Sequence, residues 1–455
     1  MQLRYQRLLY LGFILIFLIG TPVLIFYTGG YRYNFKKNQL EKTGILVVQT
    51  SPGQAQLFLN GQRRELTPAR LLHVLPDNYT LELTKTGYYP WRGEVEVASG
   101  LTTFVTDVML FPQYLPTLLT AADVRLFEPS PNHQYLLYSV RGEQEEQIHI
   151  VTTDATHDTL VTRLPLTDFD QLGVAAWSTD ESQVALRLTA QDREQYLLID
   201  TIAGGIRTLD DTTKLNFRQV RWAPGKSDEL FGLGKSILYQ INVGNATTQR
   251  LLAAEINDFY LQGQWLYVIT HQPDSTLLQR FDATNFNEKT ARSIKLPSDG
   301  FVFEPSPNGW LALRNAKNAD LSIVSTKAFT VDDITEQIVL QTKAQRIDWT
   351  PNGEQVLMAT DFEITTFNLQ TREKRTITRQ GQPILDAFWH PRGTHIIYQL
   401  GDQVRIIENS PLQKNEIAIA NVTKINGIAI DPNASQLFIN ARIGERAGIY
   451  QLPLR

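Results

Sequence analysis

The sequence predicts an all-β protein behind a single N-terminal transmembrane helix: a small β-sandwich, then a β-propeller of eight blades. Three observations predict this fold. Residues 8 to 27 carry no charge, residues 43 to 110 are short apolar and β-branched runs between turn formers, and one turn motif returns along the rest of the chain.

Composition excludes several function classes before any motif is considered. The 455 residues are 42% hydrophobic and 20% charged, which is typical of folded domains. The 43 basic and 47 acidic residues leave a net charge of −4 without long single-sign blocks, so we predict no nucleic-acid partner. The absence of cysteine excludes disulfides, thiolate nucleophiles, iron–sulfur clusters and Cys-ligated zinc.

The uncharged run predicts a transmembrane anchor over residues 8–28, preceded by a short cytoplasmic tail, residues 1–7. Twenty residues at about 1.5 Å each span a hydrocarbon core of about 30 Å. A cleaved signal peptide is the alternative, but its apolar region is shorter and ends in small residues, whereas this run continues to Tyr27 and Thr28. We therefore predict that the membrane is a partner through residues 8–28.

The flanking charges do not decide the orientation of this helix. Arg4 and Arg7 precede it, and Arg32, Lys36 and Lys37 follow it. Because long domains translocate largely regardless of such charges, we predict a single-pass protein of the cell membrane with the bulk of the chain extracytoplasmic. Residues 29–42 are predicted to be a juxtamembrane linker.

Residues 43–112 are predicted to form a compact β domain. Five short runs rich in β-branched and apolar residues alternate with Pro, Gly and Asn, which favours five to seven strands in a small sandwich. The runs are ILVVQT, QAQLFLN, TLELTKT, GEVEVAS and FVTDVML.

This segment resembles the PEGA domain, a small β module common in bacterial envelope proteins. The likeness is carried by Ser51, Pro52, Gly53, Ala55, Leu57–Gly61, Thr67, Pro68, Pro76–Tyr79, Lys85, Gly87 and Tyr88. The sequence departs from the signature at Gln54 and at Asn78. Asn78 stands where the family usually has glycine, and we expect it to adopt the left-handed backbone conformation of that glycine. The resemblance implies a binding or spacer role at the cell surface and no catalysis. Tyr88, Tyr89 and Trp91 are interpreted as packing aromatics.

Residues 113–455 repeat one turn eight times, always between two apolar strands. The pivots are Pro131, Thr179, Pro224, Gly263, Pro307, Pro351, Pro391 and Pro432. Their spacing of 39 to 48 residues is close to the roughly 40 to 45 of a four-stranded propeller blade. We predict eight blades, with seven as the alternative if the weak copy at Gly263 has merged with a neighbour.

Two further expectations follow from the repeat. The aromatics before the pivots, Trp177, Trp222, Trp349 and Trp389, are expected to pack between adjacent blades. The last pivot is followed by only two clear strands, so the segment from Tyr114 is expected to supply the missing outer strand and close the ring. The motif resembles the TolB-like propeller repeat, most closely at residues 349–353 and 389–393.

The sequence contains no motif that predicts a catalytic, cofactor-binding or metal-binding residue. Two Gly-Lys-Ser triplets, residues 225–227 and 234–236, lack the upstream glycine of a phosphate loop and are interpreted as turns. His390 and His395 are interpreted as ordinary loop residues. The acidic residues Asp210–Asp211, Asp332–Asp333 and Glu145–Glu146 are interpreted as parts of solvated loops.

The order of anchor, small module and ring predicts a membrane-anchored, non-enzymatic binding or scaffold protein. Its propeller is expected to engage an envelope protein or a cell-wall glycan, with the small domain as stalk or accessory binder. The alternative is an extracytoplasmic propeller hydrolase or lyase acting on glycans or peptides, with an active site assembled from several blades at the central channel.

Overall fold

The computed structural model describes residues 2–154, 157–191, 193–329, 334–410 and 415–455. Contacts divide the chain into two compact units. The first comprises residues 1–114, 408–417 and Arg455, and the second comprises residues 115–407 and 418–454. Each unit is described by itself.

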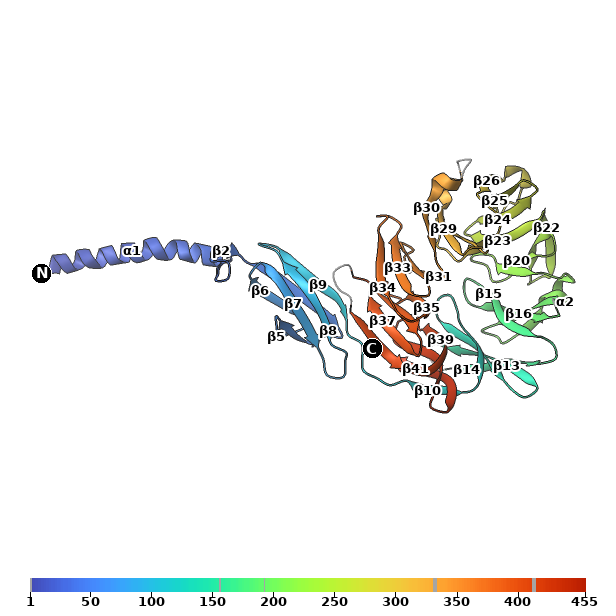
Figure 1. The fold of residues 1–455 in the computed structure, drawn as a ribbon, viewed down its shortest axis with the longest axis horizontal. Helices are drawn as coiled ribbons and strands as arrows, with labels where there is room; N and C mark the ends of the chain where they lie inside the picture. Colours follow the sequence, from blue (N-terminus) through green and yellow to red (C-terminus); the bar gives the residue numbers. More distant parts are fainter. Residues whose placement is uncertain (1, 155–156, 192, 330–333, 411–414) are drawn as a thin grey trace. The chain divides into compact units, whose positions relative to one another are not determined.

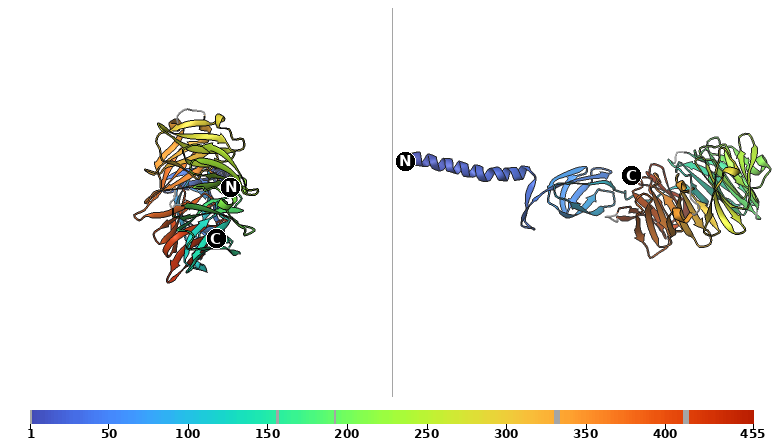
Figure 2. Two further views of the ribbon diagram at one scale, coloured as in Figure 1. Left: turned by 90° about the vertical axis from the view of Figure 1, so that its right-hand side faces the viewer. Right: turned by 90° about the horizontal axis from the view of Figure 1, so that it is seen from above.

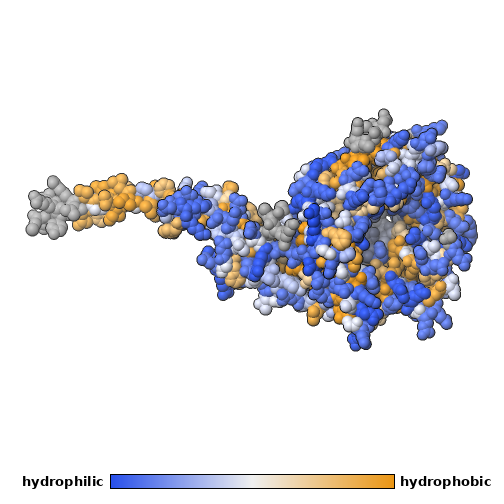
Figure 3. All heavy atoms as spheres, in the orientation of Figure 1, coloured by the Kyte–Doolittle hydropathy of each residue, from blue (hydrophilic) through white to orange (hydrophobic). Residues whose placement is uncertain are grey.

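The first unit begins with helix α1 (Gln2–Thr28), whose residues Leu9–Thr28 are long and apolar enough to cross a membrane. The mean hydropathy of this stretch is 2.5, and none of it is buried. Its side chains form the apolar surface coloured orange in Figure 3. The helix continues through Pro22 and ends at Gly29 and Gly30, where Gly30 has a φ of +83°.

A hairpin follows the helix where the sequence predicted a linker. Strands β1 (Tyr31–Asn34) and β2 (Gln39–Lys42) pair antiparallel, with Tyr33 opposite Leu40. Alternating aromatic and polar residues in YRYN are compatible with a strand, but the run is too short to predict one.

The small domain is a two-sheet sandwich of seven strands, which confirms its predicted architecture. One sheet has the order β6-β3-β9, with β3 and β9 parallel, and the other has the order β5-β4-β7-β8. Alternating apolar residues of β3, β4 and β7 face inward, so Leu46, Leu57 and Leu81 are fully buried. The strands are β3 (Gly44–Ser51), β4 (Gln56–Leu59), β5 (Gln62–Leu66), β6 (Ala69–Val74), β7 (Asp77–Thr84), β8 (Trp91–Val97) and β9 (Thr102–Met109).

The residues of the signature turn meet in one cluster of hydrogen bonds. The amide of Gln54, whose φ is +64°, donates to the carbonyl of Thr67 at 2.7 Å, and Lys85 Nζ donates to the carbonyl of Gly53 at 2.7 Å. The peptide bonds preceding Pro52 and Pro68 are cis. The explanation offered for Asn78 was wrong, because Asn78 lies inside β7 and has no left-handed backbone.

Replacing Thr67 by valine is expected to destabilise the small domain by about 1–3 kcal/mol. The buried Thr67 hydroxyl accepts the amide of Ala55 at 3.0 Å and lies 2.5 Å from the Thr50 hydroxyl, and valine of similar shape leaves that amide without an acceptor. Urea unfolding measures the change. The exposed Thr102→Val is the control, and equal stability of both variants would contradict this role.

The second unit contains eight four-stranded antiparallel sheets in its described residues, arranged in succession around a ring (Figure 1). In every sheet the predicted pivot lies between the first and second strands. The weak fourth copy, at Gly263, lies in a four-stranded sheet of its own, with the order β23-β24-β25-β26.

The first four sheets consist of the following strands: β11 (Val124–Pro129), β12 (Tyr135–Arg141), β13 (Glu145–Thr152), β14 (Asp158–Pro165); β15 (Gln171–Trp177), β16 (Gln183–Ala190), β17 (Arg193–Asp200), β18 (Ile206–Thr208); β19 (Gln219–Trp222), β20 (Glu229–Leu233), β21 (Ile237–Asn242), β22 (Thr247–Ala253); β23 (Ile256–Gln262), β24 (Trp265–Gln272), β25 (Ser275–Asp282), β26 (Arg292–Leu296). Short helices α2 (Leu209–Thr213) and η1 (Glu288–Thr290) lie in connections.

The other four sheets consist of β27 (Phe301–Glu304), β28 (Trp310–Asn315), β29 (Asp320–Ser325), β30 (Ile338–Lys343); β31 (Arg346–Trp349), β32 (Gln355–Ala359), β33 (Glu363–Asn368), β34 (Lys374–Arg379); β35 (Ile384–Trp389), β36 (His395–Leu400), β37 (Gln403–Glu408), β38 (Glu416–Asn421); and β39 (Thr423–Ile430), β40 (Gln436–Ile443), β41 (Arg446–Pro453) with β10 (Thr117–Ala121). Short helices η2 (Thr326–Ala328) and η3 (Ile334–Gln337) lie between β29 and β30.

Strand β10 closes the ring, as the sequence predicted. It pairs antiparallel with β41 as the outer strand of the last sheet, with Ala121 opposite Gly448. The first and last sheets also share a buried cluster that includes Leu136, Tyr138 and Phe438. Pairing both chain ends in one sheet leaves no open gap in the ring.

Candidate functional site

Carboxyl groups on the first strands of several sheets form the candidate site of the second unit. These strands lie nearest the middle of the ring, around the hollow visible in Figure 3. Glu128 lies on β11, Asp258 on β23, Asp348 on β31 and Asp386 on β35. Each stands alone in a short apolar or aromatic run, so the inner strands bring together charges that are far apart in sequence.

Asp258 joins its own sheet to the sheets on both sides of it. Its Oδ2 accepts the amide of Phe303 on β27 at 2.7 Å, and its Oδ1 accepts the side chain of Gln219 on β19 at 2.7 Å. Arg221 on β19 forms an ion pair with the same carboxylate at 3.6 Å. One buried side chain thus connects three consecutive inner strands, which is a structural role.

Asp348 makes the same kind of contact further along the ring. Its Oδ2 accepts the amide of Trp389 on β35 at 2.6 Å. Burial raises the pKa of Asp348 to about 6, and the charge of Asp386 acts in the same direction, whereas the backbone amides of Trp389 and Trp349 lower it.

The charge of Asp386 on β35 acts on Glu128, which lies on the first strand of another sheet, β11. Burial raises the pKa of Glu128, and the charge of Asp386 raises it further. Burial also raises the pKa of Asp386, opposed by the amide of Ala387 and by Arg346, whose Nε lies 4.0 Å from Asp386 Oδ1. These two carboxyls therefore hold a proton more readily than exposed carboxyls do.

Asp348→Asn is expected to make the ring more stable at pH 8 by about 1–2 kcal/mol and to leave stability at pH 4 nearly unchanged. The pKa of Asp348 in the folded protein lies above the usual value of 3.8, so the folded protein favours the protonated carboxyl. The stability that this carboxyl contributes is therefore fully present below about pH 4 and is lost as the pH rises through about 6. Asparagine still accepts the Trp389 amide. Urea unfolding across pH, with the exposed Asp361→Asn as control, checks this; identical pH profiles for wild type and D348N would contradict it.

The structure confirms the predicted role of the pivot tryptophans. Trp177, Trp222, Trp349 and Trp389 belong to four apolar clusters, each formed by two adjacent sheets. Trp349 also donates its indole N–H to the carbonyl of Pro305 in the preceding sheet at 2.8 Å. These aromatics build the ring.

Several polar residues are placed differently from their prediction. His390 and His395 are buried, with ring centroids 6.0 Å apart, and burial lowers the pKa of His395 to about 4, with Arg392 adding to the effect. Asp210 is buried on α2 beside Arg193, and Glu146 is buried on β13, where it accepts the Ser139 hydroxyl at 2.6 Å. Asp332 and Asp333 lie outside the described residues.

Both Gly-Lys-Ser triplets are turns, as predicted, between β19 and β20 and between β20 and β21. Among the described residues, no group of three or more His, Asp or Glu side chains is placed to hold a metal ion.

A cleft of about 660 Å³ lies in the small domain, between the edge strands β5 and β6 of its two sheets. Its wall is apolar at Leu59, Leu72 and Val74, and the charged residues beside it are Arg64, Arg70 and Glu65, two cations and one anion. An open cleft between two sheet edges offers unpaired backbone groups and two cations to a partner. No sequence motif marked these residues.

Residues 43–109 match the sequence profile of the PEGA domain. This is the finding that identifies the small sandwich. It is a PEGA domain, and four of the signature residues predicted from the sequence, Gly53, Ala55, Thr67 and Lys85, take part in its turn cluster. No curated protein matches the chain by sequence.

Solved structures similar to the chain are propeller-containing proteins at low sequence identity. They include a eukaryotic initiation factor (13% identity, 80% of this chain and 94% of that chain covered, TM-score 0.49). A dipeptidyl peptidase 4 from Porphyromonas gingivalis shares 10% identity (71% and 56% covered, TM-score 0.48). The β-propeller domain of Myceliophteria thermophila Cps50 (Swd1) shares 10% (64% and 96% covered, TM-score 0.43).

Proposed function

We propose that this chain is a membrane-anchored, non-enzymatic scaffold outside the cell, in which the PEGA domain and the propeller present binding surfaces. The contacts of Asp258 and Asp348 are the observation that supports this proposal. Both carboxyls bind backbone amides of the next sheet, so these two polar side chains of the inner strands maintain the ring. A PEGA domain and a propeller together support a binding or scaffold role.

Helix α1 is the proposed anchor, uncleaved and spanning the membrane once. Residues Leu9–Thr28 have the length and apolar composition that this requires, and they bury nothing within the protein. Extraction of cell membranes with alkaline carbonate, combined with the mass of the mature N-terminus, tests this. A protein released by carbonate, or one that lacks residues 1–28, would contradict the anchor.

The proposed partner is an envelope protein or a cell-wall glycan. The PEGA cleft, with Arg64 and Arg70 beside an apolar wall, suits an anionic group on an extended chain. In one experiment, full-length protein in detergent is incubated with purified cell wall. In a second experiment, the protein is cross-linked to its neighbours in intact cells. R64Q/R70Q is expected to lose retention, whereas R163Q, on the exposed side of β14, retains it; equal retention would contradict a role for this cleft.

A second candidate function is an extracytoplasmic hydrolase or lyase acting on glycans or peptides. The carboxyls of Glu128 and Asp386 favour it, because carboxyls with raised pKa values serve as general acids. Only the enzyme is expected to release a product from the polymer that it binds, whereas the scaffold is expected to bind without release.

A further inference from the structure

The β1–β2 hairpin is joined firmly to the end of α1. Arg32 Nη1 donates to the carbonyl of Tyr27 at 2.9 Å, and its guanidinium stacks on the Tyr27 ring at 3.7 Å from the centroid. The amide of Thr43 donates to the carbonyl of Gly30 at 2.9 Å. In Figures 1 and 2 the hairpin projects sideways from the helix end instead of continuing along its axis. Its tip therefore lies near the level at which the apolar helix ends.

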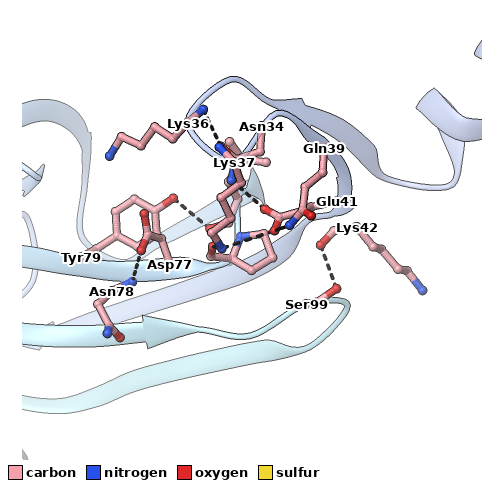
Figure 4. A network of polar contacts seen from close by, with 12 residues as sticks. Asn34, Lys36, Lys37, Gln39, Glu41, Lys42, Asp77, Asn78, Tyr79 and Ser99 are labelled. Atoms are coloured by element: carbon pink, nitrogen blue, oxygen red, sulfur yellow. Dashed lines mark hydrogen bonds and ion pairs between the residues drawn. The ribbon is translucent and has the colours of Figure 1, made fainter.

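A polar network gives the hairpin a fixed shape (Figure 4). Asn34, which is buried, donates to Glu41 Oε2 at 2.7 Å and accepts the amide of Lys36 at 3.0 Å. Lys37 binds Glu41 at 3.3 Å and the carbonyl of Pro76 in the PEGA domain at 3.2 Å. These bonds, led by those from Asn34 and Gln39, hold the pKa of Glu41 below its usual value. The hairpin is a built element rather than a loose linker.

This built element exposes apolar side chains that nothing in its own unit covers. Phe35 at the tip is 87% exposed, and Tyr33 and Leu40 on the adjoining strands are 45% and 48% exposed. Tyr33 and Phe35 contact each other edge to face at 5.0 Å. Next to Phe35 in the turn, Lys36 forms no ion pair within the described residues, and its side chain points away from the network in Figure 4.

We propose that the β1–β2 hairpin is a second membrane contact, in which Phe35 inserts among the headgroups of the leaflet where α1 ends and Lys36 binds anionic phospholipid. This rests on the proposed function, since it requires α1 to span the membrane. Aromatic side chains favour the membrane interface, and basic residues close to the surface are attracted to anionic lipid. The occupant is a lipid surface because the exposed group lies seven residues beyond the end of the apolar helix.

The absence of cysteine makes a direct test possible. Full-length chains carrying single substitutions Leu40→Cys, Leu15→Cys or Ile202→Cys are spin-labelled and reconstituted into vesicles of phosphatidylcholine, with or without phosphatidylglycerol. The ratio of collisions with oxygen to collisions with a water-soluble nickel chelate reports the depth of each label. Leu15 lies within α1, and Ile202 is an exposed turn residue of the propeller.

We expect the Leu40 label to show a ratio several-fold above that of the Ile202 label, and more so with phosphatidylglycerol. Adding Phe35→Ser should return the collision ratio of the Leu40 label to the aqueous value. Adding Lys36→Gln should remove the dependence of this ratio on phosphatidylglycerol. Phe362→Ser, at an exposed phenylalanine of the propeller, should leave the ratio unchanged. An aqueous Leu40 label beside a lipid-embedded Leu15 label would overturn the hairpin contact and leave the anchor standing. An aqueous Leu15 label would overturn both.

Discussion

Gly448→Val is expected to destabilise the ring by about 3 kcal/mol and to release strand β10. A Cβ at Gly448 would lie 2.1 Å from the carbonyl oxygen of Thr120 and 2.9 Å from Leu118, so β10 and β41 have to separate. Since this pairing joins the two ends of the ring, its loss leaves β41 as an unpaired edge of the last sheet. Hydrogen exchange of residues 117–121 and urea unfolding followed by tryptophan fluorescence measure the effect.

Gly173→Ala is the matched control for this prediction. Gly173 also lies in a strand, β15, but a Cβ there meets nothing within 4 Å. Its stability and its exchange at residues 117–121 should equal those of the wild type. Wild-type protection of β10 in G448V would mean that β10 does not close the ring.

Asp258→Ala is expected to cost about 3–5 kcal/mol of stability, comparable to breaking a buried ion pair. The substitution leaves the Phe303 amide and the Gln219 side chain without their acceptor and removes the partner of Arg221. Asp258→Asn, which keeps an acceptor but loses the charge, should lie between D258A and the wild type. The measurement is the midpoint of urea unfolding.

The control for this substitution is Asp123→Ala. The Asp123 side chain is 63% exposed and pairs only with the equally exposed Arg125, so its removal should change stability by less than about 0.5 kcal/mol. If D258A unfolds at the same urea concentration as D123A, the inner-strand carboxyls do not hold the sheets together.

The parts of the fold predicted from sequence are those specified by local chemistry. The turn at Pro351–Gly353 lies between β31 and β32, as predicted, and Gly353 has the positive φ that the turn requires. The outer strand β10 was predicted because the last repeat has too few strands of its own to complete a four-stranded sheet. The PEGA signature was found because its residues occur in order over one short segment.

The residues that sequence reasoning missed depend on contacts between distant segments. Asp348 and Asp386 look like any polar residue of a half-exposed strand, and only the packing of adjacent sheets places Asp348 in the field of Asp386. Glu146 stands next to Glu145 in an acidic run, but β13 alternates, so one side chain faces solvent and the other the interior. His395 is buried for another reason, because it begins β36, a strand whose six residues are all buried.

The most direct test of the proposed function measures binding and turnover on one sample. Full-length protein is incubated with purified cell-wall polysaccharide, and both the retained protein and the newly released reducing ends are quantified. We predict retention without release, and no change in E128Q/D386N. Release of product that is lost in this double variant would contradict a scaffold and make Glu128 and Asp386 the acid–base pair of an enzyme.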